Sequence, residues 1–79
     1  MPFKLFPNPA KESFIVTGTY SRDNLELKMF NISGKTVFST TFDEESIEIS
    51  TKDLPNGLYL VNIYSNNQLV QSIKVTITK

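Results

Sequence analysis

The 79-residue sequence predicts an all-β fold, an immunoglobulin-like antiparallel β-sandwich of about seven short strands in a single domain that covers residues 1–79. Three observations predict this class. Apolar and polar residues alternate with a period of two, turn residues recur about every 8–12 positions after the first connection, and no segment has a convincing helical period. The inner faces of the two sheets are apolar, so such a sandwich needs no disulfide.

The expected strands lie between these turn signals. In the segment 24–31, leucine and methionine alternate with charged residues, which predicts one buried and one solvated face. Phe30 and Ile32 break the alternation, so we expect a bulge or a change of sheet there. The seven expected strands cover residues 3–6, 13–18, 24–31, 36–42, 46–50, 57–65 and 68–79.

Two hairpins connect the later strands. Asn31, Ser33 and Gly34 are turn residues, and Gly34 can adopt the positive φ that such a loop requires. Asn66 and Asn67 mark a second turn. Alternation then predicts that the rows Tyr59, Val61, Ile63 and Ile73, Val75, Ile77 face the core, whereas Lys74, Thr76 and Thr78 point outward.

Pro7 and Pro9 separate the first two strand-like segments. Proline has no backbone N–H and fixes φ, so both cannot belong to a hydrogen-bonded ladder. Because they join two strands of one small domain, we expect a rigid corner, which ends one strand and leads the chain into the next, rather than a flexible linker.

Composition excludes several functions. Eight basic and eight acidic residues give zero net charge, which argues against nucleic-acid binding. No apolar run approaches the ~20 residues of a membrane-spanning helix. The chain has neither cysteine nor histidine, so most nucleophile–base pairs and metal sites are excluded, and we expect no catalysis and no cofactor. A pairing of serine with Lys74 is formally open, although no sequence feature fixes its geometry.

Three weaker patterns each have a functional and a structural interpretation. The acidic run Asp43, Glu44, Glu45 and Glu48 could hold calcium weakly, but it lacks the ligand spacing of an EF-hand and is better explained as a solvated loop. The segment 31–33 fits the glycosylation pattern, but the turn explains it better, because such a three-residue pattern is common by chance. The three tyrosines could form a sugar-binding platform, but packing in the core or at an edge explains them better; they are Tyr20, Tyr59 and Tyr64.

Four motifs occur in a fixed order along the chain: "FPNPA" near the start, "NISGKTV" in the central hairpin, "LPNGLYLVNI" at a strand start, and "SIKVTITK" in the last strand. Together they resemble the type A C-terminal sorting domain of the type IX (Por) secretion system, over essentially the whole chain. The residues that carry the resemblance are Pro7, Asn8, Pro9, Ala10, Gly34, Lys35, Leu54, Gly57, Tyr59, Lys74 and Lys79.

The resemblance implies that the chain is an address label at the C-terminus of a larger exported cargo protein, and it requires the native chain to end at or near Lys79. Such domains direct cargo from the periplasm through the outer membrane to the cell surface. The implied partners are translocon and shuttle proteins and a sortase-like surface peptidase that removes the domain.

Physical reasoning divides the family residues into two groups. The prolines and glycines suit corners, and Leu54 and Tyr59 suit packing. Lys35, Lys74 and Lys79 have less structural reason to be fixed, because exposed ion pairs contribute little stability. We therefore expect recognition at the last strand, through pairing of a receptor with an open sheet edge. Open edges also lead us to expect strand exchange between two copies.

A second hypothesis from another class is an immunoglobulin-like ligand-binding module of a surface protein, for carbohydrate or adhesion. Both hypotheses predict the same fold, so the fold cannot separate them. The ligand-binding module requires a concave surface with several exposed aromatic side chains or a metal site, and the sorting domain requires neither.

Overall fold

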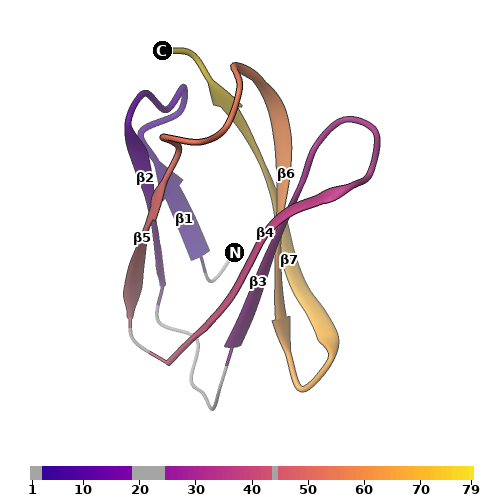
Figure 1. The fold of residues 1–79 in the computed structure, drawn as a ribbon. Helices are drawn as coiled ribbons and strands as arrows, with labels where there is room; N and C mark the ends of the chain where they lie inside the picture. The colour runs from indigo at the N-terminus through magenta and orange to yellow at the C-terminus, as the bar shows by residue number, and fades with distance from the viewer. Residues whose placement is uncertain (1–2, 19–24, 44) are drawn as a thin grey trace.

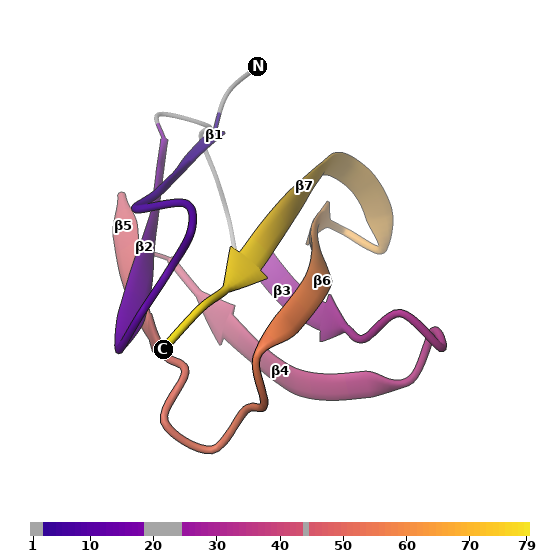
Figure 2. The same ribbon diagram turned by 90° about the horizontal axis from the view of Figure 1, so that it is seen from above.

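A computed structural model describes residues 3–18, 25–43 and 45–79, and this part of the chain forms two antiparallel sheets without a helix. The sheets lie face to face as the two layers of a sandwich (Figures 1 and 2). This confirms the predicted fold class. The strands are β1 (Phe3–Phe6), β2 (Ser13–Gly18), β3 (Leu25–Phe30), β4 (Thr36–Phe42), β5 (Ser46–Ser50), β6 (Gly57–Ser65) and β7 (Gln68–Ile77).

One sheet has three strands in the order β1–β2–β5, and the other has four in the order β4–β3–β6–β7. The chain changes sheet after β2, β4 and β5, so neighbours in the sequence lie in opposite layers at these points. The last strand ends at Ile77, two residues earlier than predicted. The edge strands β1 and β7 meet on one side of the sandwich, whereas β4 and β5 lie on the other (Figure 2).

The core forms where the alternating rows of the two sheets meet. Tyr59, Val61 and Ile63 are buried as predicted, and so are Val75 and Ile77. These side chains pack with residues of β1, β2 and β3 in one hydrophobic cluster. Burial of such rows supplies most of the stability of a small sandwich, at roughly 1.5–3 kcal/mol for each large side chain.

The expected irregularity at the end of β3 is a β-bulge. The register between β3 and β4 shifts between Met29 and Phe30, so that Phe30 lies opposite Thr36 instead of continuing the ladder. Phe30 itself stays in the regular alternation of β3: it follows Glu26 and Lys28 on the outer face, where it is half-buried. The extra residue of the bulge therefore lies on β4, where Val37 has no partner in the ladder with β3.

Both predicted hairpin turns are present. The side-chain Oδ1 of Asn31 accepts hydrogen bonds from the backbone N–H of Ser33 (2.9 Å) and of Lys35 (3.0 Å), and Gly34 has φ +85°. Asn66 and Asn67 have φ of 53° and 66°, as a two-residue turn between strands requires. The 31–33 segment is thus a turn built on its own asparagine.

Candidate recognition surface

The proline corner at residues 7–10 lies along the outer edge of β7. Asn8 Nδ2 donates to the carbonyl of Lys74 (3.0 Å), and Asn8 Oδ1 accepts from the N–H of Thr76 (3.1 Å). The backbone of Ala10 continues the pairing: its N–H donates to Thr76 (2.7 Å), and its carbonyl accepts from Thr78 (2.9 Å). Residues 7–10 therefore connect β1 to β2 as a corner that also pairs with β7 like a short additional strand.

This pairing corrects the expectation that β7 offers an open edge. A primary amide carries one donor group and one acceptor side by side, as a peptide group does, so Asn8 can replace a strand residue. The backbone groups from Lys74 to Thr78 that a receptor strand would use are already bonded to the corner. A receptor that pairs with this stretch must first displace residues 8–10.

A second side-chain amide joins β1 to β7, next to the corner. We call the contact of Phe3 and residues 8–10 with β7 the seam. Gln71 of β7 accepts from the N–H of Phe3 through Oε1 (2.9 Å) and donates to the carbonyl of Phe3 through Nε2 (2.9 Å), and both bonds are buried. Sequence reasoning did not identify Gln71. The sequence does contain a sign of this role, because the inward row at 71, 73, 75 and 77 is apolar except for Gln71.

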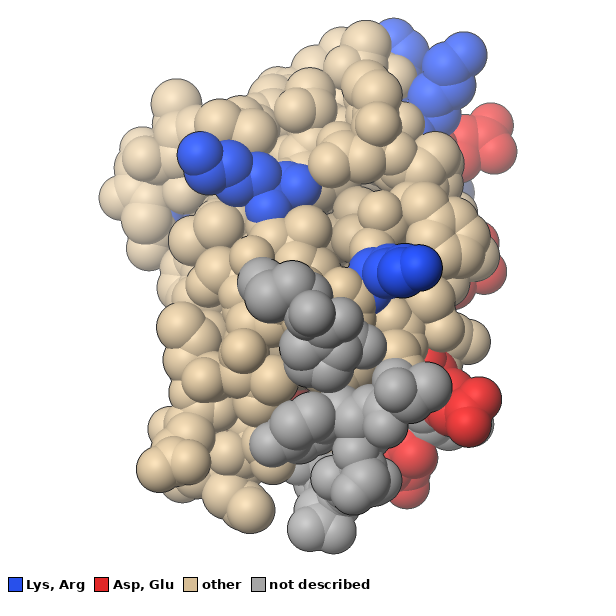
Figure 3. Space-filling view, turned by 180° about the vertical axis from the view of Figure 1, so that it is seen from behind, with Lys and Arg blue, Asp and Glu red and all other residues tan. Residues whose placement is uncertain are grey.

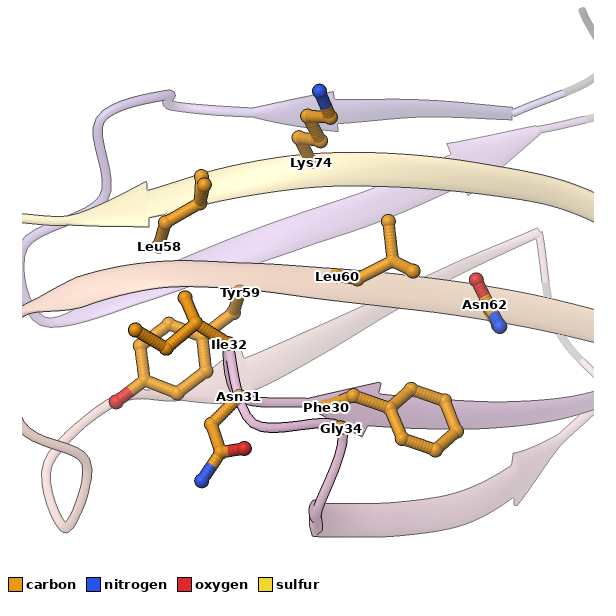
Figure 4. A pocket seen from close by; sticks show the side chains of 9 residues that line it. All are labelled: Phe30, Asn31, Ile32, Gly34, Leu58, Tyr59, Leu60, Asn62 and Lys74. Atoms are coloured by element: carbon orange, nitrogen blue, oxygen red, sulfur yellow. The ribbon is translucent and has the colours of Figure 1, made fainter.

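The outer face of the four-stranded sheet carries an apolar groove of about 580 Å³. Phe30, Leu60 and Lys74 lie opposite one another on β3, β6 and β7, and they form a row across the sheet. Leu58 and Ile32 extend the groove toward the central hairpin (Figure 4). The groove thus has aliphatic and aromatic walls with an ammonium group at the β7 side.

Two apolar side chains that line this groove are exposed to solvent. Ile32 is 82% exposed and Leu58 is 46% exposed, whereas most large apolar side chains of the described residues are buried or half-buried. Lys74 is exposed and forms no ion pair within the described part of the chain, where the ion pair found joins Lys28 and Glu26 (3.9 Å). A contiguous apolar surface with an unpaired charge at its rim is typical of a protein-binding site.

The structure brings three of the family residues together at this groove, because Gly34, Tyr59 and Lys74 all line it. Lys35 follows Gly34 in the hairpin but is not part of the lining. The corner residues 7–10 do not line the groove, although Asn8 binds the backbone carbonyl of Lys74. Sequence reasoning missed the apolar walls, because single exposed leucines and isoleucines have no pattern of their own.

The remaining family residues lie at the loop that precedes β6. The hydroxyl of Tyr59 donates to the carbonyl of Pro55 (2.6 Å), so this buried ring fastens the loop to the core. Leu54 is half-buried against the core, and Gly57 has φ +155°, an unusual value for residues with a Cβ. The structural roles proposed for these residues agree with their positions.

Lys79 lies against the same loop. Its backbone N–H donates to Asn56 Oδ1 (3.1 Å), and its Nζ donates to the carbonyl of Lys52 (3.2 Å). Lys79 is therefore at a distance from the groove along β7, and the structure does not bring it together with Lys74. Lys35, Lys74 and Lys79 therefore lie in three different places: the central hairpin, the groove and the loop before β6.

The acidic run does not form a metal site in the described residues. Asp43, Glu45 and Glu48 are exposed, as a solvated loop and strand predict, and no group of three potential ligands occurs in residues 3–18, 25–43 and 45–79. Glu44 lies outside the described residues. Seen from the side where β1 and β7 meet, acidic side chains appear only along one margin of the molecule (Figure 3).

The tyrosines do not form a platform in the part of the chain that the structure describes. Tyr59 is buried, and Tyr64 is half-buried beneath Lys28, whose Nζ lies 5.6 Å from the ring centre. Tyr20 lies outside the described residues.

Within the described residues, no helix is long and apolar enough to cross a membrane.

Comparison with protein families gives one match, which covers residues 4–78: the secretion system C-terminal sorting domain. The chain belongs to this family. The match begins within β1 and ends just after β7, so it includes the corner and the groove. The resemblance read from the four sequence motifs is thereby confirmed, as is the link to type IX secretion.

Two curated relatives are enzymes that carry such a domain. The sorting domain is 28% identical over 65 residues to an endo-acting ulvan lyase of Formosa agariphila, a match over 81% of this chain and 12% of that enzyme. It is 29% identical over 77 residues to the ulvan lyase NLR42 of Nonlabens ulvanivorans, over 92% of this chain and 14% of that enzyme. The chain thus spans a small part of the proteins it matches.

Proposed function

We propose that this chain directs an attached cargo protein through the type IX secretion system and across the outer membrane, and that it has no catalytic role itself. Translocon and shuttle proteins bind it, and a sortase-like surface peptidase then separates it from the cargo, which reaches the cell surface. Family membership over residues 4–78 supports the sorting role. The two relatives support the arrangement, since both are enzymes far longer than the match.

The groove on the outer face of the four-stranded sheet is the observation that supports the recognition step. It places three family residues beside the exposed side chains of Ile32 and Leu58. Removing these two side chains from water would favour association, at about 25 cal/mol for each Å² of apolar surface. The ammonium of Lys74 would orient a partner that presents a carboxylate, and a mismatched partner would leave that charge desolvated and unpaired.

The sorting role is tested by fusing the whole chain to the C-terminus of a periplasmic reporter, in a host with a type IX system and in a translocon-deficient strain. We expect the reporter at the surface of the first host and in the periplasm of the second. Retention of the reporter in the periplasm of both strains would contradict the proposal.

The recognition step is tested in the same fusion with Leu58→Asp and Lys74→Glu, each of which should reduce surface display by about tenfold or more, because central contacts dominate binding. Lys11→Glu is the matched control, since this exposed lysine lies outside the groove and its change should leave display unaltered. Circular dichroism of the purified chains establishes that all variants are folded. Equal display by all three variants would remove the groove from the mechanism.

A further inference from the structure

The strand β4 forms the edge of the four-stranded sheet opposite β7, and no other strand among residues 3–18, 25–43 and 45–79 pairs with its outer side. It pairs with β3 alone, and no backbone bond from another described segment reaches it. The side-chain bond found on its backbone comes from its own Thr40, whose hydroxyl donates to the carbonyl of Thr41 (3.4 Å). Figure 2 shows β4 as the outermost strand of its layer.

The sequence of β4, "TVFSTTF", contains none of the devices that protect an edge. It has no charge, proline or glycine, and β-branched and aromatic residues make up most of it. The other edges differ, because the corner covers β7 and the shorter β5 carries the charged Glu48. Phe38 of β4 is also 38% exposed, so pairing at this edge would cover apolar surface.

Charges of opposite sign flank the uncharged strand. Lys35 lies directly before its first residue, whereas Asp43 and Glu45 follow its last residue. If two copies pair antiparallel through β4, the basic end of each strand meets the acidic end of the other. Parallel pairing would place like charges together, so the charges select one orientation and make the strand complementary to itself.

We propose that β4 binds β4 of a second copy of this chain, antiparallel about a two-fold axis at Thr40, so that two four-stranded sheets become one. The regular part of the strand, residues 38–42, lies beyond the bulge and has Thr40 at its centre. Ser39 of one copy then lies opposite Thr41 of the other, and each Phe38 is covered. One strand pair buries little area, so the dimer is weak and forms at high local concentration.

Analytical ultracentrifugation of the whole chain, from about 20 µM to about 1 mM, tests for a weak dimer of this size class. We expect reversible dimerisation. Thr41→Lys should weaken it about tenfold, since a lysine on an edge strand opposes pairing. Gln68→Lys, which adds the same charge at an exposed position on β7, should leave it unchanged. A chain that is monomeric throughout, or equal weakening by both variants, overturns the proposal.

Single cysteines give an independent measurement, because the chain has none of its own. Thr40→Cys places the two thiols opposite each other across the axis, so mild oxidation should yield a disulfide-linked dimer. Thr76→Cys is the matched control, a half-buried threonine on the other edge strand of the same sheet, and it should remain monomeric. Faster crosslinking at position 76 than at 40 would place the interface at β7 instead.

Discussion

The two edges of the four-stranded sheet differ in how their backbone groups are satisfied. At β7, the chain supplies its own partners: Asn8 and Ala10 bond the stretch from Lys74 to Thr78, and Gln71 bonds Phe3 across the seam. At β4, a strand without charges, the outer backbone has no backbone partner within the described part of the chain. A small sandwich can therefore close one side with side-chain amides and leave the other available for a partner.

Among the substitutions that test this difference between the two edges, Gln71→Leu is expected to change stability most. The substitution keeps an apolar side chain of similar size but leaves both the N–H and the carbonyl of Phe3 without the bonds that Gln71 supplies. Since each hydrogen bond contributes about 0.5–1.5 kcal/mol and both of these are buried, the free energy of unfolding should fall by roughly 2–3 kcal/mol. Urea denaturation measures the change.

The control for this substitution is Gln68→Leu in the same strand, where the side chain is exposed and should change stability by less than about 0.5 kcal/mol. Equal loss in the two variants would mean that the amide of Gln71 does not close the seam.

A smaller effect is expected from Asn8→Ala. It removes two exposed hydrogen bonds to β7, each of which contributes about 0.5–1.5 kcal/mol, so stability should fall by about 1–2 kcal/mol. The N–H of Thr76 loses its acceptor and should exchange with solvent faster, as hydrogen exchange measured by NMR will show.

Asn8→Asp separates the acceptor role of Asn8 at β7 from its donor role. The carboxylate keeps the acceptor for Thr76 but loses the donor to the carbonyl of Lys74. Exchange at Thr76 should therefore remain slow, although stability falls. Fast exchange in both variants would show that the acceptor of Asn8 does not protect this edge.

The smallest effect on folding is expected from Thr41→Lys on the open edge. Thr41 is exposed and lies opposite Glu26 on β3, so the new charge should change the free energy of unfolding by less than about 0.5 kcal/mol. Heat-induced aggregation, followed by light scattering, should nevertheless be slower, because a charge blocks edge-to-edge association. Unchanged aggregation would indicate that β4 is not the exposed edge through which chains associate.

Local patterns predicted most of the fold. Alternation in the last two strands identified the core rows, the break at Phe30 and Ile32 located the bulge, and Asn66 and Asn67 located a turn. Each of these features depends on neighbours within a few residues, which a single sequence displays directly.

The seam and the groove could not be predicted in the same way. The bonds from Asn8 and Phe3 to β7 join residues that are 66 and 68 positions apart, and no local pattern encodes such a pairing. The motifs led to Lys74 but placed recognition at an open backbone edge. The groove depends on which side chains adjacent strands place together, and that follows from strand order.

The bonds between the first and last strands also set the order in which the fold can be completed. The corner and β1 find their partners on β7, the last of the seven strands to be synthesised. Until β7 arrives, the buried amide that bonds Phe3 is missing and the corner has no edge to cover. A chain that lost its final strand through premature termination would leave this side unsealed. Closure of the seam therefore requires that β7 has been synthesised.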